Sequence, residues 1–253
     1  MIHFGKTDVG MRRSGNQDNF GIYELGENAT LLVVCDGMGG VSGGERASRL
    51  ALDAFYSTVK DVCEPKIEDG KLDISAIKIP VLLEEALGEA NRVVYKEAKA
   101  HPELEGMGTT LVALFFCDGT AYSLNVGDSR LYGITEGKAT QITRDHSYVQ
   151  MLIDMGRLTL EEAKDNPQKN IITRAVGTSE ELEADIAPVD SALLSDGSYF
   201  LLCSDGLSNM MDDDEIAAIA CGEGSLEEKA AKMVENANEN GGLDNITVVL
   251  AQI

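Results

Sequence analysis

The sequence predicts an α+β fold, with antiparallel sheets in the interior and helices layered outside them. Two observations carry this prediction. Short apolar runs occur in consecutive pairs joined by two-residue turns, as they do in β-hairpins. Longer amphipathic segments occur in two separate pairs, and a helix of this kind packs its apolar face against a sheet. The chain has 253 residues, enough for a large buried core, and we expect residues 1–253 to form a single domain.

The first half of the chain contains both kinds of signal. Residues 31–35 are the apolar run Leu-Leu-Val-Val-Cys, which ends at Asp36-Gly37 and predicts a buried strand. Residues 42–60 place apolar side chains at helical spacing, and a second helix is expected over residues 81–100, directly after Pro80. The dipeptide Asp118-Gly119 separates the strand-like runs 110–117 and 120–126, which predicts a hairpin.

The second half repeats the pattern after a polar insertion. A hairpin is expected over residues 131–142, around Glu136-Gly137. Residues 145–178 are polar and predict short helices, one of which begins with the capping box Thr159-Leu-Glu-Glu162. On one of these helices, Met151 and Met155 fit a single face, and we expect them to pack in the core. Strands are expected at 199–204 and 245–253, with helices at 214–220 and 225–238 between them.

The charge balance excludes two classes of partner. Lys and Arg number 21 against 43 Asp and Glu, for a net charge of −22. Nucleic acids and anionic membrane surfaces both attract clustered basic residues, so neither is expected to bind here. No apolar run approaches the roughly 18 residues of a spanning helix. The five cysteines are scattered without metal-binding or redox spacing, as in a reduced cytoplasmic protein.

Aspartates recur at the ends of the predicted strands. Asp36, Asp128 and Asp205 each follow an apolar run and lie beside a glycine, and Asp244 directly precedes the last strand. One Asp-Gly pair at a strand end is most often a turn. Four of them at the ends of adjacent strands are expected to meet at one sheet edge, where they would repel one another unless cations bound between them. An all-oxygen ligand set favours Mg²⁺ or Mn²⁺ over zinc.

A basic segment near the start of the chain adds a phosphate-binding feature. The sequence Arg12-Arg13-Ser-Gly-Asn-Gln-Asp18 places two cations shortly before another aspartate. Such a segment is often a solvated turn, but an arginine fork beside a metal cluster also binds phosphate well. Asp18 would then help to hold metal-bound water.

Six motifs occur in order along the chain and together identify a family. They are Arg13-(x)4-Asp18, Asp36-Gly-Met-Gly-Gly40, Gly108-Thr-Thr110, Gly127-Asp-Ser-Arg130, Ser204-Asp-Gly-Leu207 and Asp244-Asn245. The sequence resembles the metal-dependent Ser/Thr protein phosphatases of the 2C type, in their bacterial stand-alone form, from about residue 3 to residue 252. The resemblance implies a four-layer α-β-β-α sandwich of two antiparallel sheets flanked by helix pairs, with residues 145–178 as a flap beside the active site.

The resemblance also implies a metal centre of two Mn²⁺ or Mg²⁺ ions, with a third more loosely bound. Asp36 would bridge two ions, and the Gly37 carbonyl would bind one of them. Asp205 and Asp244 would complete the other. Asp128, together with Asp205, would hold the third ion.

The implied reaction is hydrolysis of phosphoserine and phosphothreonine in proteins by a metal-activated water. Arg13 would grip the substrate phosphate, Asp36 and Asp205 would act with it in catalysis, and Asp18 would bind a metal-bound water. A Ser/Thr kinase whose products are dephosphorylated is the implied partner. The sequence leaves open a phosphatase of small phosphate esters and a pseudophosphatase that only binds phosphoproteins.

Two positions depart from the family pattern. Met38 stands where many eukaryotic members carry the histidine proposed as general acid, and a thioether donates no proton. Gln17 stands where many members have glutamate. His146, which follows Asp145, is an alternative proton donor, although a structural role for it is favoured.

Overall fold

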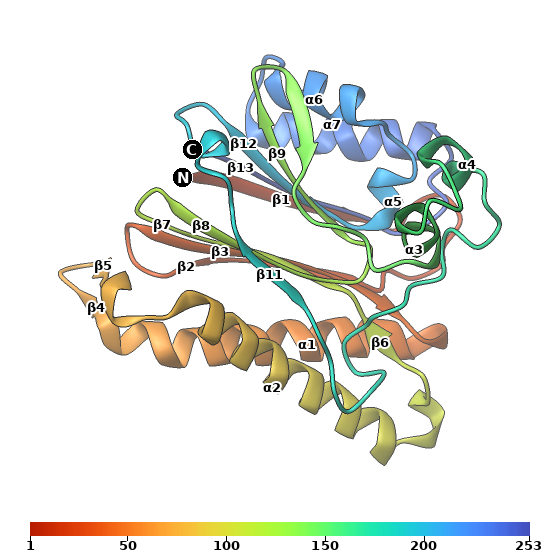
Figure 1. The fold of residues 1–253 in the computed structure, drawn as a ribbon, viewed down its shortest axis with the longest axis horizontal. Coiled ribbons are helices and arrows are strands. Elements are labelled where there is room, and N and C mark those ends of the chain that lie inside the picture. Colours follow the sequence, from red (N-terminus) through yellow and green to blue (C-terminus); the bar gives the residue numbers. More distant parts are fainter.

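The protein is a sandwich of four layers in a computed structural model that describes residues 1–253, apart from the side chains of residues 41 and 42 (Figure 1). Helices α1 (Gly40–Cys63) and α2 (Ile79–Ala100) cover the outer face of one sheet. Helices α6 (Asp213–Cys221) and α7 (Leu226–Glu239) cover the outer face of the other. The α-β-β-α sandwich expected from the sequence is therefore confirmed.

The sheet under α1 and α2 runs in the order β11-β8-β7-β3-β2, with β6 paired to the C-terminal end of β3. Its neighbouring strands are antiparallel, and the hairpin at Asp118-Gly119 forms as expected. The bounds of its strands are β2 Asp18–Glu24, β3 Ala29–Met38, β6 Gly108–Thr109, β7 Leu111–Cys117, β8 Thr120–Val126 and β11 Asp185–Pro188.

The other sheet runs in the order β1-β13-β12-β9-β10, again antiparallel throughout. It joins the first and last strands of the chain, so the N-terminal segment lies beside the C-terminal one (Figure 1). The bounds of its strands are β1 Ile2–Asp8, β9 Arg130–Thr135, β10 Lys138–Gln141, β12 Tyr199–Cys203 and β13 Ile246–Gln252.

Three apolar layers separate the four layers of secondary structure, and strand alternation sorts side chains between them. In β3, Leu31, Val33 and Cys35 face the helices α1 and α2. Leu32 and Val34 face the opposite sheet and pack in the space between the sheets. By the same alternation, the next residue on the inter-sheet side of β3 is Asp36.

The flap (residues 145–178) contains two short helices, α3 (Tyr148–Asp154) and α4 (Leu160–Lys164). The capping box expected at the start of α4 is present, with Thr159 and Glu162 exchanging hydrogen bonds. The expectation that Met151 and Met155 pack in the core is wrong: they are 38% and 56% exposed. The short flap helices lie apart from both sheets, so no apolar layer is available to bury their faces (Figure 1).

The remaining elements are small. They are the two-residue strands β4 (Ile67–Glu68) and β5 (Lys71–Leu72), the one-turn helix α5 (Asp205–Ser208), and four three-residue 3₁₀ helices at Glu64–Lys66, Ile74–Ala76, Pro102–Leu104 and Ser191–Leu193. Among the described residues, no helix has both the length and the apolar character needed to cross a membrane.

Candidate active site

Strand ends from both sheets meet at one end of the inter-sheet space, and their last inward-facing residues are polar. Asp18 begins β2 and lies directly opposite Asp36 of β3, so both carboxylates are on the same face. Across the gap, Thr247 of β13 donates from Oγ1 to Oδ2 of Asp18 at 2.7 Å. The apolar layer between the sheets therefore gives way to a polar cluster at this end.

The aspartates predicted from the sequence come together here, but not at the edge of one sheet. Asp36 and Asp128 belong to β3 and to the loop after β8, in the six-stranded sheet. Asp205 and Asp244 follow β12 and precede β13, in the five-stranded sheet. The expectation of a single sheet edge is wrong, because stacking two antiparallel sheets face to face brings strand ends from both to one end of the sandwich.

Four of these aspartates line a cavity of about 560 Å³: Asp36, Asp128, Asp205 and Asp244. The backbone of Gly37 and the side chains of Arg13 and Met38 also line it, as do Asn170 and Ile172 of the flap. Asp18, which is 5% exposed, lies behind this wall. Gly37 is required by close packing, since a Cβ there would collide with the carbonyl of Gly44.

Burial and mutual repulsion make four carboxyl groups of this cluster hard to ionise: those of Asp18, Asp36, Asp128 and Asp205. Burial is the largest cause at each position, and the other carboxylates add to it. The pKa of Asp18 is raised to about 6, that of Asp205 to about 6 and that of Asp128 to about 8. The pKa of Asp36 is raised well above its usual value. At Asp205 the positive charges of Arg13 and Arg130 offset part of the shift.

The donor set fits a hard divalent cation. Every candidate ligand is oxygen, as Mg²⁺ and Mn²⁺ prefer. Oδ1 of Asp18 and Oδ1 of Asp205 are buried without a hydrogen-bond partner among the described residues, so each keeps an unused acceptor. In the described part of the chain, no three acidic, histidine or cysteine side chains are already grouped for ligation.

Arg13 reaches this cluster from the loop between β1 and β2. Its Nη2 donates to Oδ2 of Asp244 at 2.6 Å, and its side chain is 52% exposed. The pKa of Arg13 is raised, mainly by this hydrogen bond to Asp244. An exposed guanidinium beside a carboxylate cluster can bind the phosphoryl group of a substrate that enters from solvent.

Several residues around the site were given no role on sequence grounds. The side chain of Thr110 accepts from the backbone N–H of Asp36 at 2.9 Å and contacts Ser129 at 2.7 Å. Asn245 is 4% exposed and bonded to the Arg13 loop. Their place inside the sequence motifs could have indicated a role, because a hydroxyl or carboxamide beside an apolar strand needs a hydrogen-bond partner when it is buried. The side-chain N–H of Gln17 donates to the carbonyl of Gly40, at 2.6 Å.

Comparison with known proteins decides the family. The sequence matches the family described as protein phosphatase 2C over residues 11–251. The chain belongs to the protein phosphatase 2C family. It is 38% identical over 255 residues to the protein phosphatase PhpP of Streptococcus pneumoniae, covering 98% of this chain and 95% of that protein.

Solved structures show the same fold as this protein phosphatase 2C chain. The serine/threonine phosphatase of S. agalactiae superposes with a TM-score of 0.87 at 35% identity, covering 98% of each chain. The catalytic domain of the serine/threonine protein phosphatase PstP, in complex with two manganese ions, superposes with a TM-score of 0.80 at 34% identity, covering 99% of this chain and 97% of that one.

In this phosphatase 2C chain, His146 is built into the base of the flap. Its Nδ1 accepts from the backbone N–H of Gly127 at 3.2 Å, which leaves the proton on Nε2. Nε2 lies 3.2 Å from a carboxylate oxygen of Asp185 and from Arg174. Burial lowers the pKa of His146, although Asp185 opposes that shift. These contacts favour the structural role over the proton-donor role.

We therefore expect His146→Ala to weaken the fold but not to change the alkaline limb of the pH–rate profile, where loss of a proton donor would appear. The lost contacts with Gly127 and Asp185 should cost about 1–2 kcal/mol of unfolding free energy. Thermal melts and kcat/KM between pH 5 and pH 9 measure the two effects. Loss of the alkaline limb would instead assign the proton donor to His146.

Proposed function

We propose that this protein hydrolyses phosphoserine and phosphothreonine in protein substrates, with the help of divalent metal ions. One observation carries the proposal: four aspartates from two sheets and an exposed arginine line the same cavity of about 560 Å³. Family membership supports it, because relatives of this chain are named serine/threonine phosphatases. We treat residues 1–253 as one catalytic domain, with the flap as part of it.

The aspartates are proposed as the metal ligands, together with one backbone oxygen. Asp36 would contact two ions, and the carbonyl of Gly37 would contact one of them. Asp205 and Asp244 would hold the other of the pair, and Asp128 would join Asp205 in holding a third. Bound divalent cations supply positive charge at the phosphoryl oxygens and acidify water at neutral pH. The all-oxygen donors accept Mn²⁺ or Mg²⁺.

Arg13 is proposed to bind the substrate phosphate. Its guanidinium has five N–H donors, and among the described residues it makes one hydrogen bond, from Nη2 to Asp244. The remaining donors are free to engage two phosphoryl oxygens at once. Asp244 thereby aligns the arginine. Asp18, whose Oδ2 accepts from Thr247, is proposed to use its buried Oδ1, unpartnered among the described residues, to accept a hydrogen bond from a metal-bound water.

A cysteine nucleophile does not fit this site. Cys35 and Cys203 are the cysteines nearest in sequence to the acidic motifs, and both are fully buried in apolar layers. Burial raises the pKa of the Cys203 thiol to about 12 and raises that of Cys35 further. A thiol in this environment stays protonated and unreactive. Water is therefore proposed to attack phosphorus directly, with no covalent enzyme intermediate.

The partners follow from the substrate class. A phosphoserine or phosphothreonine protein is the product of a Ser/Thr kinase, so we propose that the protein acts in opposition to such a kinase. The absence of a spanning helix from the described residues and the net charge of −22 are compatible with the proposed cytoplasmic location.

The test compares two substrates with and without metal. The purified protein is assayed on p-nitrophenyl phosphate and on a phosphothreonine peptide, with Mn²⁺, with Mg²⁺ or with EDTA. We expect turnover of both substrates with either metal, no turnover with EDTA, and a higher kcat/KM for the peptide. A higher kcat/KM for nucleotides or sugar phosphates would favour a small-ester phosphatase. A folded protein with no turnover under any condition would favour the binding-only alternative.

A further inference from the structure

The loop that carries Arg13 is shaped by one buried side chain from the other end of the chain. Asn245 directly precedes β13 and is 4% exposed. Its Nδ2 donates to the carbonyls of Val9 and Gly15, each at 2.9 Å. Its Oδ1 accepts from the backbone N–H of Gln17 at 2.9 Å. These three backbone groups lie on both sides of Arg13 in the sequence.

This set of contacts needs a carboxamide. A carboxamide offers two N–H donors and a carbonyl acceptor on one planar group. An aspartate at the same position keeps the acceptor but turns both donors into acceptors, which would repel the carbonyls of Val9 and Gly15. An alanine leaves all three backbone groups without their partner, and unpaired buried polar groups are costly. Asn16 makes a further bridge between the flanking strands, since its Nδ2 donates to Oγ1 of Thr7 at 2.8 Å and its Oδ1 accepts from the backbone N–H of Asp18 at 3.0 Å.

Asn245 is itself held in place by a bond to Asp244, one of the proposed metal ligands. Its backbone N–H donates to Oδ1 of Asp244 at 2.8 Å, while Oδ2 of Asp244 accepts from Arg13. The loop also packs tightly here, because a Cβ on Gly10, at a φ of +77°, would collide with the carbonyl of Asp244. The position of Asp244 and that of Arg13 are thus linked through Asn245 and its neighbours.

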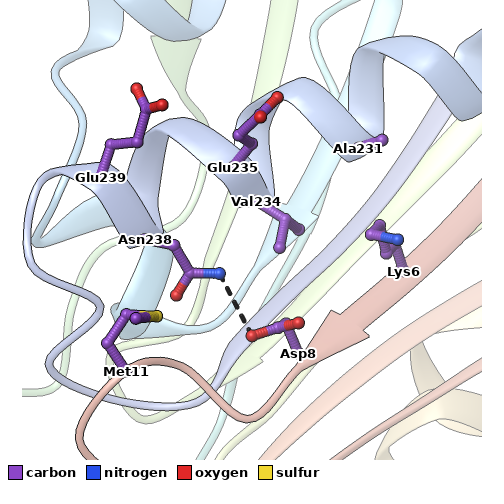
Figure 2. A pocket seen from close by; sticks show the side chains of 8 residues that line it. All are labelled: Lys6, Asp8, Met11, Ala231, Val234, Glu235, Asn238 and Glu239. Atoms are coloured by element: carbon purple, nitrogen blue, oxygen red, sulfur yellow. Dashed lines mark hydrogen bonds between the residues drawn. The ribbon is translucent and has the colours of Figure 1, made fainter.

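A second tie joins the same two segments on the outer surface. Met11 donates its backbone N–H to the carbonyl of Gly242 at 2.8 Å. Asp8 at the end of β1 accepts from Nδ2 of Asn238 of α7 at 3.2 Å, as Figure 2 shows in a cleft of about 540 Å³. Asp8 also accepts from the backbone N–H of Gly10 at 2.9 Å. These contacts anchor the start of the loop, whereas Asn245 bonds to residues on both sides of Arg13.

We propose that Asn245 is a positioning residue, which sets the conformation of loop 9–17 so that Arg13 points at the substrate phosphate. The inference rests on the proposed function, because it acts through the phosphate-binding role of Arg13. A loop freed from Asn245 would let Arg13 sample other positions. Misplacing a binding group by about 1 Å is enough to cost roughly a hundredfold in rate.

Hydrogen exchange of the Gln17 amide tests the structural half of the proposal without any metal or substrate. In the wild-type protein this amide should be protected, although it lies in a loop. In Asn245→Ala it should exchange at least about tenfold faster, while core amides of β3 and β13 keep their rates. The matched control is Asn240→Ala, which removes another carboxamide of the same region, one that donates to the carbonyl of Met210. An unprotected Gln17 amide in the wild type would overturn the proposal.

A double-mutant cycle tests the functional half. We expect Asn245→Ala to lower kcat/KM for p-nitrophenyl phosphate by about tenfold to a hundredfold, mostly through a higher KM. Arg13→Ala should cost much less in the Asn245→Ala background than in the wild type, because the arginine is already misplaced. Additive effects would overturn the proposal, since a general loss of stability acts independently of Arg13. An inactive wild-type protein would refute the proposed function and leave the exchange test intact.

Discussion

Asp205→Asn is expected to lower metal-dependent turnover by roughly a thousandfold or more and to leave the fold intact. Asp205 is the first residue of α5, and one of its oxygens accepts from Nδ2 of Asn209 at 3.0 Å. Its other oxygen is buried without a partner among the described residues. An asparagine fills the same space but removes the negative charge that a cation needs. The rate with Mn²⁺ on p-nitrophenyl phosphate measures the loss.

The same substitution should stabilise the protein when metal is removed. Burial, and then repulsion from Asp244, raise the pKa of Asp205 to about 6, so the charged carboxylate is disfavoured in the folded state at pH 8. The neutral amide avoids that cost, and we expect a higher melting temperature in EDTA. Asp196→Asn, in the exposed turn before β12, is the matched control and should change neither property. Retention of more than a tenth of the activity would contradict the assignment of Asp205 as a ligand.

The sequence predicted the inner elements of the fold better than its edges. The hairpins at Asp118-Gly119 and Glu136-Gly137 form as expected, and Asp118 and Glu136 adopt the positive φ angles that such turns require. Strands β1, β2 and β11 were not predicted. They are edge strands, so their residues alternate weakly: β1 has no fully buried residue and contains Lys6 and Asp8. Edge strands have no second partner that would demand an apolar pattern.

The candidate site was predicted in its residues but not in its geometry. The four strand-end aspartates and Arg13 do line one cavity. Their division between two sheets could not be predicted, because local sequence does not specify which strands share a sheet. The roles of Thr247 and Asn245 also escaped prediction. Their partners, Asp18 and the loop around Gly15, are about 230 positions away along the chain, and only the closed fold brings them together.

Without metal, the protein is expected to lose stability as the pH rises from about 5 to about 8. Burial, and then the charges of Asp205 and Asp145, raise the pKa of Asp128 to about 8, whereas in the unfolded chain it is near 4. Between these values the folded state binds more protons than the unfolded state, so unfolding free energy falls with rising pH. The stabilisation is complete below about pH 4 and is lost as the pH passes about 8. Asp18 and Asp205, with pKa values of about 6, add to the fall at its lower end.

Asp128→Asn separates this effect from the general titration of an acidic protein. In EDTA, the wild type should lose about 3–4 kcal/mol of unfolding free energy between pH 5 and pH 8 through Asp128, and the variant should not show this part of the loss. Asp196→Asn should follow the wild type at both pH values. Adding Mn²⁺ should raise the melting temperature of the wild type more at pH 8 than at pH 5, because a cation requires ionised carboxylates. Melting temperatures that stay level or rise from pH 5 to pH 8 in EDTA would show that these aspartates do not strain the fold. The physical case for a cation holding them together would then be lost.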